Sequence, residues 1–380
     1  MKYFLYYFLL PLLFQCLNCM FFTKIFYQIN KEKIGENLII SPLSIYQLLS
    51  LLSNGAKGET ISEMIKALGS SNIEELNDIN RKILEQSKLF SNIEIANAIM
   101  TKCKPLNSFL MYAKLYLADV EILESVEQIN NWCSEKTHGK INQIIEELNP
   151  QTKMILLNAV YFKGNWVFPF DKDSNMKLPF YNLGKEKILV ETMVGIENYR
   201  YFENPEFQII ELPFKEDFMS AIIILPSENS DINLYIESLL SKDQSKLYQL
   251  IQKLDYARVQ IELPKFEINF SQVLNNDLKK LGIKQIFECE KGDLSGLCEE
   301  EKNIWVSSII HKTYLKINES GTEAASVTAA IALGMAINYN KEIIIYKMKV
   351  NRPFLFILKN SRFPQGYDIV FMGKIEKILD

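Results

Sequence analysis

Two histidines, His138 and His311, are the only imidazoles with which this 380-residue chain could carry out acid–base or metal chemistry. Neither belongs to an HExxH pattern, and the chain has no GxSxG elbow, Walker loop or GxGxxG fingerprint. A Ser-His-Asp hydrolase would have to use one of the two. We interpret both as structural, with His138 on the polar face of a helix around Trp132 and His311 hydrogen-bonded and buried at the start of a strand. The sequence therefore favours a protein that is not an enzyme and needs no metal or cofactor.

Cysteine is the second residue type that could carry chemistry, and the chain has six of them. Two lie in the first nineteen residues. The other four, Cys103, Cys133, Cys289 and Cys298, contain no CxxC pair, and four are too few for a disulfide scaffold. We expect buried thiols or, at most, one or two bridges.

The first nineteen residues read as a secretory signal peptide. A single early charge, Lys2, precedes an apolar stretch over residues 3–14, which is too short and too interrupted for a membrane span. Secretion would place the protein outside the cell and would expose two N-x-[ST] sequons, at Asn269 and Asn318, to glycosylation. We therefore expect a secreted glycoprotein.

Overall composition excludes several classes of protein. The chain has 48% hydrophobic residues, and 42 basic against 46 acidic groups give a net charge of −4. This is the composition of a globular protein, and the lack of a broad basic field argues against a nucleic-acid partner. No linker rich in Gly, Pro or Ser divides the chain, and no repeat is present. We expect one domain over residues 20–380, monomeric and without a membrane segment.

The first half of the chain has helical patterns. Residues 60–68 place apolar side chains on one face, begin with a capping-box pattern of Thr60 and Glu63, and end at Gly69. A second helix is expected around residues 129–141.

Strand patterns dominate the second half of the chain. The apolar run 154–162 predicts a strand buried on both faces, and residues 259–263 alternate as in a half-buried strand. Residues 219–225, 354–358 and 367–372 predict further apolar strands. Helices followed by strands indicate an α+β fold with a large sheet. The three tryptophans, Trp132, Trp166 and Trp305, are expected in the core.

One segment, residues 319–351, does not fit a plain core. It contains no proline and is rich in small residues between 321 and 332. By propensity part of it predicts a helix. As a strand, it would place Thr322, Ala324 and Ser326 on one uniformly small face, while Gly321 would permit the backbone to pivot. Such a segment is suited to entering a sheet that already exists.

Nine short motifs follow one another along the chain. They are Asn37–Ile45, Gly55–Thr60, Asn158–Trp166, Glu211–Phe214 with Leu225-Pro226, Leu263–Phe266, His311-Lys312, Glu319–Ala325, Asn351–Phe354 and Phe371–Lys374. In this order and spacing the sequence resembles the serpin family of serine protease inhibitors. The resemblance implies helices packed on a large mixed or antiparallel main sheet, further sheets, and an exposed reactive loop at about residues 319–348.

The resemblance also implies a mechanism. A target serine protease would attack the loop and form an acyl-enzyme, and the cleaved loop would enter the main sheet as a new strand that traps the covalent complex. The implied hinge comprises Glu319, Gly321, Thr322, Glu323, Ala324, Ala325 and Ser326. Non-inhibitory members carry bulky, charged or proline residues there, whereas this chain departs only at Ser320 and Val327. The alternative is a non-inhibitory serpin acting as a carrier, chaperone or storage protein.

The family's usual loop length places the scissile bond at Met335-Ala336. Methionine suits an elastase- or chymotrypsin-like pocket, which accepts a medium apolar side chain. Because the segment before Pro353 is long, other bonds compete, and these rivals follow Leu333, Tyr339 and Lys341.

Four residues resemble the family's shutter, the polar cluster that controls opening of the sheet. They are Ser41, Ser44, Asn158 and His311. Buried polar groups of this kind cost about 1–3 kcal/mol each when left unpaired. The region of Arg81, Lys82 and Lys88, where some relatives bind heparin, forms no compact basic patch, so no heparin site is expected.

Overall fold

A computed structural model of the chain describes residues 20–87, 93–215, 218–241, 245–289, 291–298, 304–321 and 344–379. The leader, the hinge residues from Thr322 onward, the scissile bond Met335-Ala336 and its rivals at Leu333, Tyr339 and Lys341 lie outside these residues. The hinge residues Glu319, Ser320 and Gly321 lie within them.

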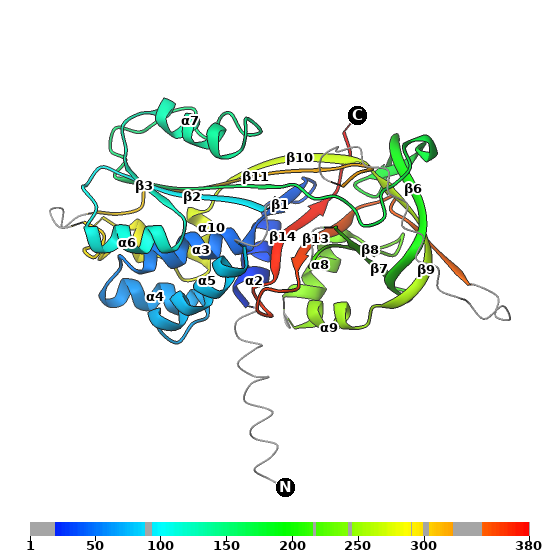
Figure 1. Cartoon of the computed structure of the whole chain (residues 1–380), viewed down its shortest axis with the longest axis horizontal. Helices are drawn as coiled ribbons and strands as arrows, with labels where there is room; N and C mark the ends of the chain where they lie inside the picture. The colour runs from blue at the N-terminus through cyan, green and yellow to red at the C-terminus, as the bar shows by residue number, and fades with distance from the viewer. Residues whose placement is uncertain are drawn as a thin grey trace, which may run out of the picture.

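The described strands form two sheets (Figure 1). The first has five strands in the order β10-β11-β4-β2-β3: Phe266–Val273, Ser308–Ile317, Met154–Phe162, Ile93–Thr101 and Asp119–Ile122. The second has nine. Eight follow the order β1-β14-β13-β8-β7-β6-β9-β12: Leu38–Ile40, Ile369–Ile375, Phe354–Asn360, Met219–Pro226, Phe207–Pro213, Glu186–Glu203, Asp255–Pro264 and Ile345–Lys349. The ninth, β5 (Met176–Asn182), pairs with β6.

The described helices concentrate in the first third of the chain. They are α2 (Met20–Asn30), α3 (Pro42–Ser53), α4 (Gly58–Leu68), α5 (Ile73–Ser87), α6 (Asn107–Leu115), α7 (Val126–Lys136), α8 (Ile232–Leu240), α9 (Lys246–Gln252) and α10 (Asn275–Lys280), with short 3-10 turns at Lys172–Ser174 and Gln285–Phe287. Figure 1 shows α7 alone on one face of the five-stranded sheet and α3 to α6 on the other. The arrangement agrees with the predicted α+β class.

The five-stranded sheet is buried on both faces, and β4 at its centre shows why the apolar run predicted a strand. All nine residues of β4 are buried. Ile155, Leu157 and Tyr161 join α7 in one hydrophobic cluster, whereas Leu156 and Val160 face the main core on the side of α3. Because side chains alternate along a strand, a strand covered on both faces must be apolar throughout.

Helix α3 is also buried on every side, and its start is fixed locally. The Ser41 side chain accepts a hydrogen bond from the Ser44 N–H, and Pro42 occupies the first helical position. A serine cap followed by proline is a strong helix start, because proline there removes no intrahelical hydrogen bond. This start lies against β4 and β11, where the polar cluster described below is found.

The predicted helix at residues 60–68 is confirmed as part of α4, but its capping box is wrong. Lys57 is the cap residue and makes no side-chain capping bond, whereas Gly69 ends the helix in a left-handed conformation with φ 75°. Thr60 Oγ1 donates to Gln285 Oε1 at 2.9 Å. The Glu63 carboxylate accepts from the N–H groups of Lys284 and Gln285. Thr60 and Glu63 therefore bond to residues more than 200 positions away and not to each other's backbone.

Two further expectations need correction. His138 does not lie on a helix face, because α7 ends at Lys136 and His138 occupies the following turn with φ 50°. Its ring lies 2.9 Å from a carboxylate oxygen of Glu94. Trp132 and Trp166 are buried, but Trp305 is only half-buried, with the Lys153 ammonium 5.9 Å from its ring centroid.

A disulfide joins Cys103, just after β2, to Cys298, across a sequence separation of 195 residues. Of the other cysteines within the described ranges, Cys133 is buried and Cys289 exposed, and both are free. Burial raises the pKa of the Cys133 thiol to about 12. Among the open possibilities for the four cysteines, the structure therefore has one bridge and two thiols.

In the described residues, no helix is long and apolar enough to cross a membrane. In the same residues, no group of three or more His, Cys, Asp or Glu side chains is arranged to hold a metal ion.

Candidate functional site

The site begins with two neighbouring strands that run in the same direction. Strands β4 and β11 pair in parallel from Ile155↔Ser308 to Tyr161↔Tyr314, with β2 and β10 on their outer sides. Beyond Tyr314, β11 continues to Ile317 paired with β10 only. The central pair therefore separates at this end of the sheet.

Directly after β11 the chain makes a tight turn from Asn318 to Gly321. The Asn318 N–H donates to the Gly321 carbonyl at 2.7 Å, and the Gly321 N–H returns a bond at 3.1 Å. Asn318 Oδ1 accepts from the N–H groups of Ser320 and Gly321 at 3.0 and 3.2 Å. The sequon asparagine therefore forms the turn at the start of the predicted hinge.

Gly321 is required at this turn for two reasons. Its φ is 135°, which L-residues with a side chain rarely adopt. A Cβ at this position would also overlap the Gly164 carbonyl oxygen. The backbone of Gly321 forms a bridge with Asn165, three residues after the end of β4. The chain has thus crossed from the end of β11 to the end of β4.

Trp166 holds this crossing in place. Its backbone N–H donates to the Ser320 carbonyl at 2.8 Å, and its indole Nε1–H donates to the Asn318 carbonyl at 3.0 Å. The indole stacks on Phe214, with ring centroids 4.2 Å apart. The buried aromatic pair fixes the position of the turn at the open end of the sheet.

Glu319, the first residue of the predicted hinge, is buried to 7% exposure and anchored by an ion pair. Its Oε1 lies 3.0 Å from Lys265 Nζ and accepts a short hydrogen bond from Asn175. Lys265 is shared with Glu191. Burial alone would raise the pKa of Glu319, but hydrogen bonds from its own backbone N–H, Asn175 and Lys265 lower it below the ordinary value. The carboxylate is therefore ionised in the folded protein.

In the middle of the same sheet, away from the end where β4 and β11 separate, a row of polar side chains crosses three adjacent strands. Asn97 of β2 is the register partner of Asn158 of β4, and Asn158 is the register partner of His311 of β11. Asn158 Nδ2 donates to Asn97 Oδ1 at 2.6 Å, and the imidazole contacts Asn158 Oδ1 through Nδ1. Asn158 and His311 have no exposed surface.

The start of α3 completes this row. The Ser41 N–H donates to His311 Nε2 at 3.1 Å, and Ser44 Oγ lies 2.7 Å from Asn158 Oδ1. Because Nε2 accepts a hydrogen bond, the ring proton must be on Nδ1, which donates to Asn158. Burial lowers the pKa of His311 to about 3. The imidazole is therefore neutral at physiological pH.

The structure brings Ser41, Ser44, Asn158 and His311 into one hydrogen-bonded cluster. The sequence did not indicate that Asn97 belongs to this cluster, nor that Lys265 contacts the hinge. Asn97 lies in an ordinary strand sequence, and Lys265 pairs with Glu319 across 54 positions, so neither has a local sequence signal.

The two sequons lie in different surroundings. Asn269 is exposed on β10, the edge strand of the five-stranded sheet. Asn318 is half-buried, and its side-chain oxygen is engaged in the hinge turn.

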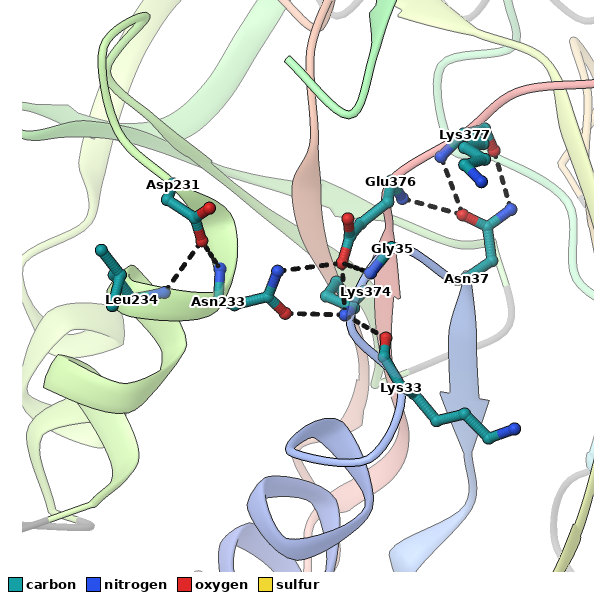
Figure 2. A network of polar contacts seen from close by, with 9 residues as sticks. All are labelled: Lys33, Gly35, Asn37, Asp231, Asn233, Leu234, Lys374, Glu376 and Lys377. Carbon is teal, nitrogen blue, oxygen red and sulfur yellow. Dashed lines mark hydrogen bonds and ion pairs between the residues drawn. The ribbon is translucent and has the colours of Figure 1, made fainter. Parts of the chain in front are cut away.

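A second buried polar network ties the ends of the chain together (Figure 2). Lys374 has no exposed surface, and its Nζ donates to the Lys33 carbonyl and to Asn233 Oδ1, both at 2.8 Å. It also pairs with Glu376, which accepts from the Gly35 N–H at 3.3 Å. Burial lowers the pKa of Lys374. The network joins β14 to the start of α8 and to the turn after α2. It contacts none of the predicted hinge residues that the structure describes.

The sequence and the fold are similar to those of known proteins. The human leukocyte elastase inhibitor is 29% identical over 379 residues, covering 94% of this chain and 97% of that protein. The crystal structure of the thermophilic serpin Tengpin in its native state has a TM-score of 0.84 and 30% identity, covering 96% of this chain and 94% of that one. The crystal structure of human thyroxine-binding globulin in complex with its ligand has a TM-score of 0.83 and 26% identity, covering 97% and 99%.

A family model described as serpin, serine protease inhibitor, matches residues 17–378, which is nearly the whole chain. The helices and the two sheets agree with the predicted fold. The chain therefore belongs to the serpin family.

Proposed function

We propose that the protein is a suicide-substrate inhibitor of a serine protease. After cleavage, the segment that follows Gly321 enters the five-stranded sheet between β4 and β11 and traps the acyl-enzyme. The observation that carries this proposal is the backbone bridge between Gly321 and Asn165. The bridge supports the proposal because Gly321, the last described residue before that segment, lies beside the separated ends of two parallel strands.

The direction of the chain supports the same proposal. A segment that leaves the end of β11 and turns back must run antiparallel to β11, and therefore also antiparallel to β4. Antiparallel pairing on both sides would satisfy every backbone N–H and C=O of the new strand. Side chains that alternate along it would face α7 on one side and α3 on the other, so small residues such as Ala324 and Ser326 favour entry.

For the target, we propose an elastase- or chymotrypsin-like protease cleaving Met335-Ala336. The similarity to a leukocyte elastase inhibitor supports this class of protease. The side chain before the proposed scissile bond, Met335, also supports it, because methionine suits an apolar specificity pocket. Cleavage after Lys341 would instead indicate a trypsin-like target. N-terminal sequencing of the released fragment distinguishes these bonds from those after Leu333 and Tyr339.

The test is incubation with elastase, chymotrypsin and trypsin, followed by electrophoresis in SDS. The proposal expects an SDS-stable complex with at least one protease, and a rise in melting temperature when the loop is cut. The matched control is Ala324→Pro, which removes a backbone N–H from the inserting strand. This variant should be cleaved without forming the complex. Cleavage of the wild-type protein with neither complex nor stabilisation would overturn the proposal.

The second candidate function is that of a non-inhibitory serpin. The structural similarity to thyroxine-binding globulin supports this candidate. That protein binds a small ligand on the same fold. The candidate predicts that cleavage of the loop leaves the protease free and active.

We also propose that the protein is secreted and that its leader is removed. The Cys103–Cys298 disulfide supports this, because such bonds persist in oxidising compartments. Exposed Asn269 would then carry a glycan, whereas Asn318 would stay unmodified because its side chain forms the hinge turn. Mass spectrometry of the protein purified from culture medium tests the N-terminus and both sites.

A further inference from the structure

The Cys103–Cys298 disulfide lies at the end of the five-stranded sheet opposite the hinge turn. Cys103 follows the last residue of β2, Thr101, by two positions, and Thr101 pairs with Met154 at the start of β4. The first residue of β11, Ser308, pairs with β4 at this end as well. The hinge turn lies beyond the other end of the same two strands. A strand that enters from the hinge side would therefore reach the disulfide end last.

Cys103 belongs to the half of the sheet formed by β4, β2 and β3. Strand β2 pairs with β4 along its whole length, and β3 pairs with the second half of β2. From Cys103 the chain continues directly into α6, which packs on β3. These elements form one body on the β4 side of the boundary between β4 and β11.

Cys298 belongs to the half formed by β11 and β10. Hydrogen bonds connect the segment 291–298 to the start of α4, then to the 3-10 turn Gln285–Phe287, and from there to the chain directly before β11. These bonds join the Lys57 N–H to the Asp293 carbonyl, the Asp293 N–H to Thr60 Oγ1, Thr60 Oγ1 to Gln285 Oε1, and the Val306 N–H to the Ile286 carbonyl. The disulfide therefore joins the two halves of the sheet.

Weaker contacts accompany the disulfide across the same boundary. The Leu106 N–H donates to the Leu297 carbonyl at 2.8 Å, and the Ser307 N–H donates to the Met154 carbonyl, also at 2.8 Å. Hydrogen bonds of this kind open and close with local fluctuations of the fold, whereas a covalent bond persists. Both bridged cysteines are buried, at 7% and 1% exposure, so thiols in solution have little access to them.

We propose that the Cys103–Cys298 disulfide is a covalent tether that keeps the two halves of the five-stranded sheet together at the end opposite the hinge. A cross-link restricts the conformations of the open sheet and so lowers its population. The tether thereby opposes separation of β4 from β11 before the loop is cut, and it slows the entry of a new strand. The tether itself is independent of the proposed inhibitory function, whereas its effect on strand entry rests on that function.

Hydrogen–deuterium exchange followed by mass spectrometry tests the tether without any protease. The double variant Cys103→Ser with Cys298→Ser is compared with the oxidised wild type. Wild-type protein reduced with dithiothreitol supplies the same change if this variant does not fold. Amides of residues 154–158 and 308–312 should exchange at least about tenfold faster, relative to those of β8 in the other sheet, when the disulfide is absent. An unchanged ratio would overturn the proposal.

The matched control separates loss of the tether from loss of overall stability. Ile236→Ala removes a fully buried side chain from α8 and leaves the disulfide in place. In this variant the ratio of exchange between the two segments and β8 should equal that of the wild type. The same rise of the ratio in Ile236→Ala would show that lost stability alone opens the sheet, and it would overturn the assignment to the disulfide.

The effect on strand entry is tested with a labelled peptide that has the sequence of residues 322–335. Its uptake by the uncut protein, measured by native electrophoresis, should be at least about threefold faster in the double variant than in the wild type and unchanged in Ile236→Ala. Equal uptake in the double variant and the wild type would overturn this effect. If no form took up the peptide and no protease formed a complex, the inhibitory function would fail, while the exchange data would still decide the tether.

Discussion

Lys265 Nζ lies 3.0 Å from Glu319 Oε1 and thereby joins the corner between β9 and β10 to the first residue of the predicted hinge. This pair is the only side-chain ion pair of Glu319 within the described residues, and it acts with the Asn175 hydrogen bond to hold the turn at the open end of the sheet. Two segments far apart in the sequence are thus tied at the point where the new strand is proposed to enter.

Breaking this pair should loosen the end of the sheet. Lys265→Met keeps the aliphatic stem but leaves the buried Glu319 carboxylate without its cation, at a cost of about 1–3 kcal/mol. We expect a lower melting temperature and faster formation of loop-sheet polymers at elevated temperature, measured by calorimetry and native electrophoresis. The control is Lys316→Met, whose partner Glu267 is exposed. Equal behaviour of the two variants would contradict the role of Lys265.

Removing the imidazole should disturb the polar row. His311→Ala leaves the Ser41 N–H and one acceptor position of Asn158 unpaired in a fully buried site, at a cost of about 1–3 kcal/mol. We expect lower thermal stability and polymerisation by linkage of loop and sheet. A melting temperature equal to that of the wild type, with the protein still monomeric after incubation, would contradict this prediction.

The depressed pKa of His311 predicts a pH dependence of stability. The folded-state pKa is about 3 against 6.5 for the free side chain, so between these values only the unfolded state binds the proton. The contribution of His311 to the free energy of unfolding is therefore fully present above pH 6.5. It decreases as the pH falls toward 3, by up to about 1.4 kcal/mol per pH unit.

The measurement is urea denaturation at several pH values for the wild type and for His311→Gln. The two proteins share every ionisable group except His311, so the difference between them isolates the contribution of His311. We expect the wild type to lose its advantage over the variant as the pH falls below 6.5. Parallel curves throughout this range would show that the folded imidazole is not held neutral.

Gly321 should not tolerate a side chain. Gly321→Ala combines an unfavourable φ with overlap on the Gly164 carbonyl, and strain of this kind costs about 1–3 kcal/mol. The matched control is Gly184→Ala, because Gly184 has φ 70° but nothing within 4 Å of an added Cβ. We expect a larger drop in melting temperature for Gly321→Ala and a lower yield of SDS-stable complex. Equal losses in the two variants would show that only φ matters.

The disulfide should contribute to stability. A native disulfide typically contributes about 2–4 kcal/mol, more when it closes a longer loop, and Cys103 and Cys298 are 195 residues apart. We expect Cys103→Ser with Cys298→Ser to lower the midpoint of urea unfolding, and dithiothreitol to lower it in the wild type alone. Cys289→Ser serves as the control, since Cys289 is free and exposed. A midpoint unaffected by either treatment would contradict the prediction.

Much of the fold follows from local patterns in the sequence. The run Met154–Phe162 is apolar throughout because a strand covered on both faces has no polar side, so its length alone gave the bounds of β4. Gly69 marked the end of α4 for a similarly local reason, since only a residue without a side chain enters the left-handed conformation readily. The small residues after Gly321 and the order of the motifs indicated the family and its hinge.

The tertiary structure decided which residues meet. Thr60 and Glu63 fit a local capping box, yet they bond to Gln285 and neighbouring backbone, because a folded chain offers partners that a sequence window does not contain. The partners of Glu319 and His311, the choice of Cys103 and Cys298 for the bridge, and the place of Asn97 in the polar row all depend on strands brought together across long separations. No repeating pattern of residue types marks such contacts in the sequence, because each contact requires only one suitable residue on each of the two segments.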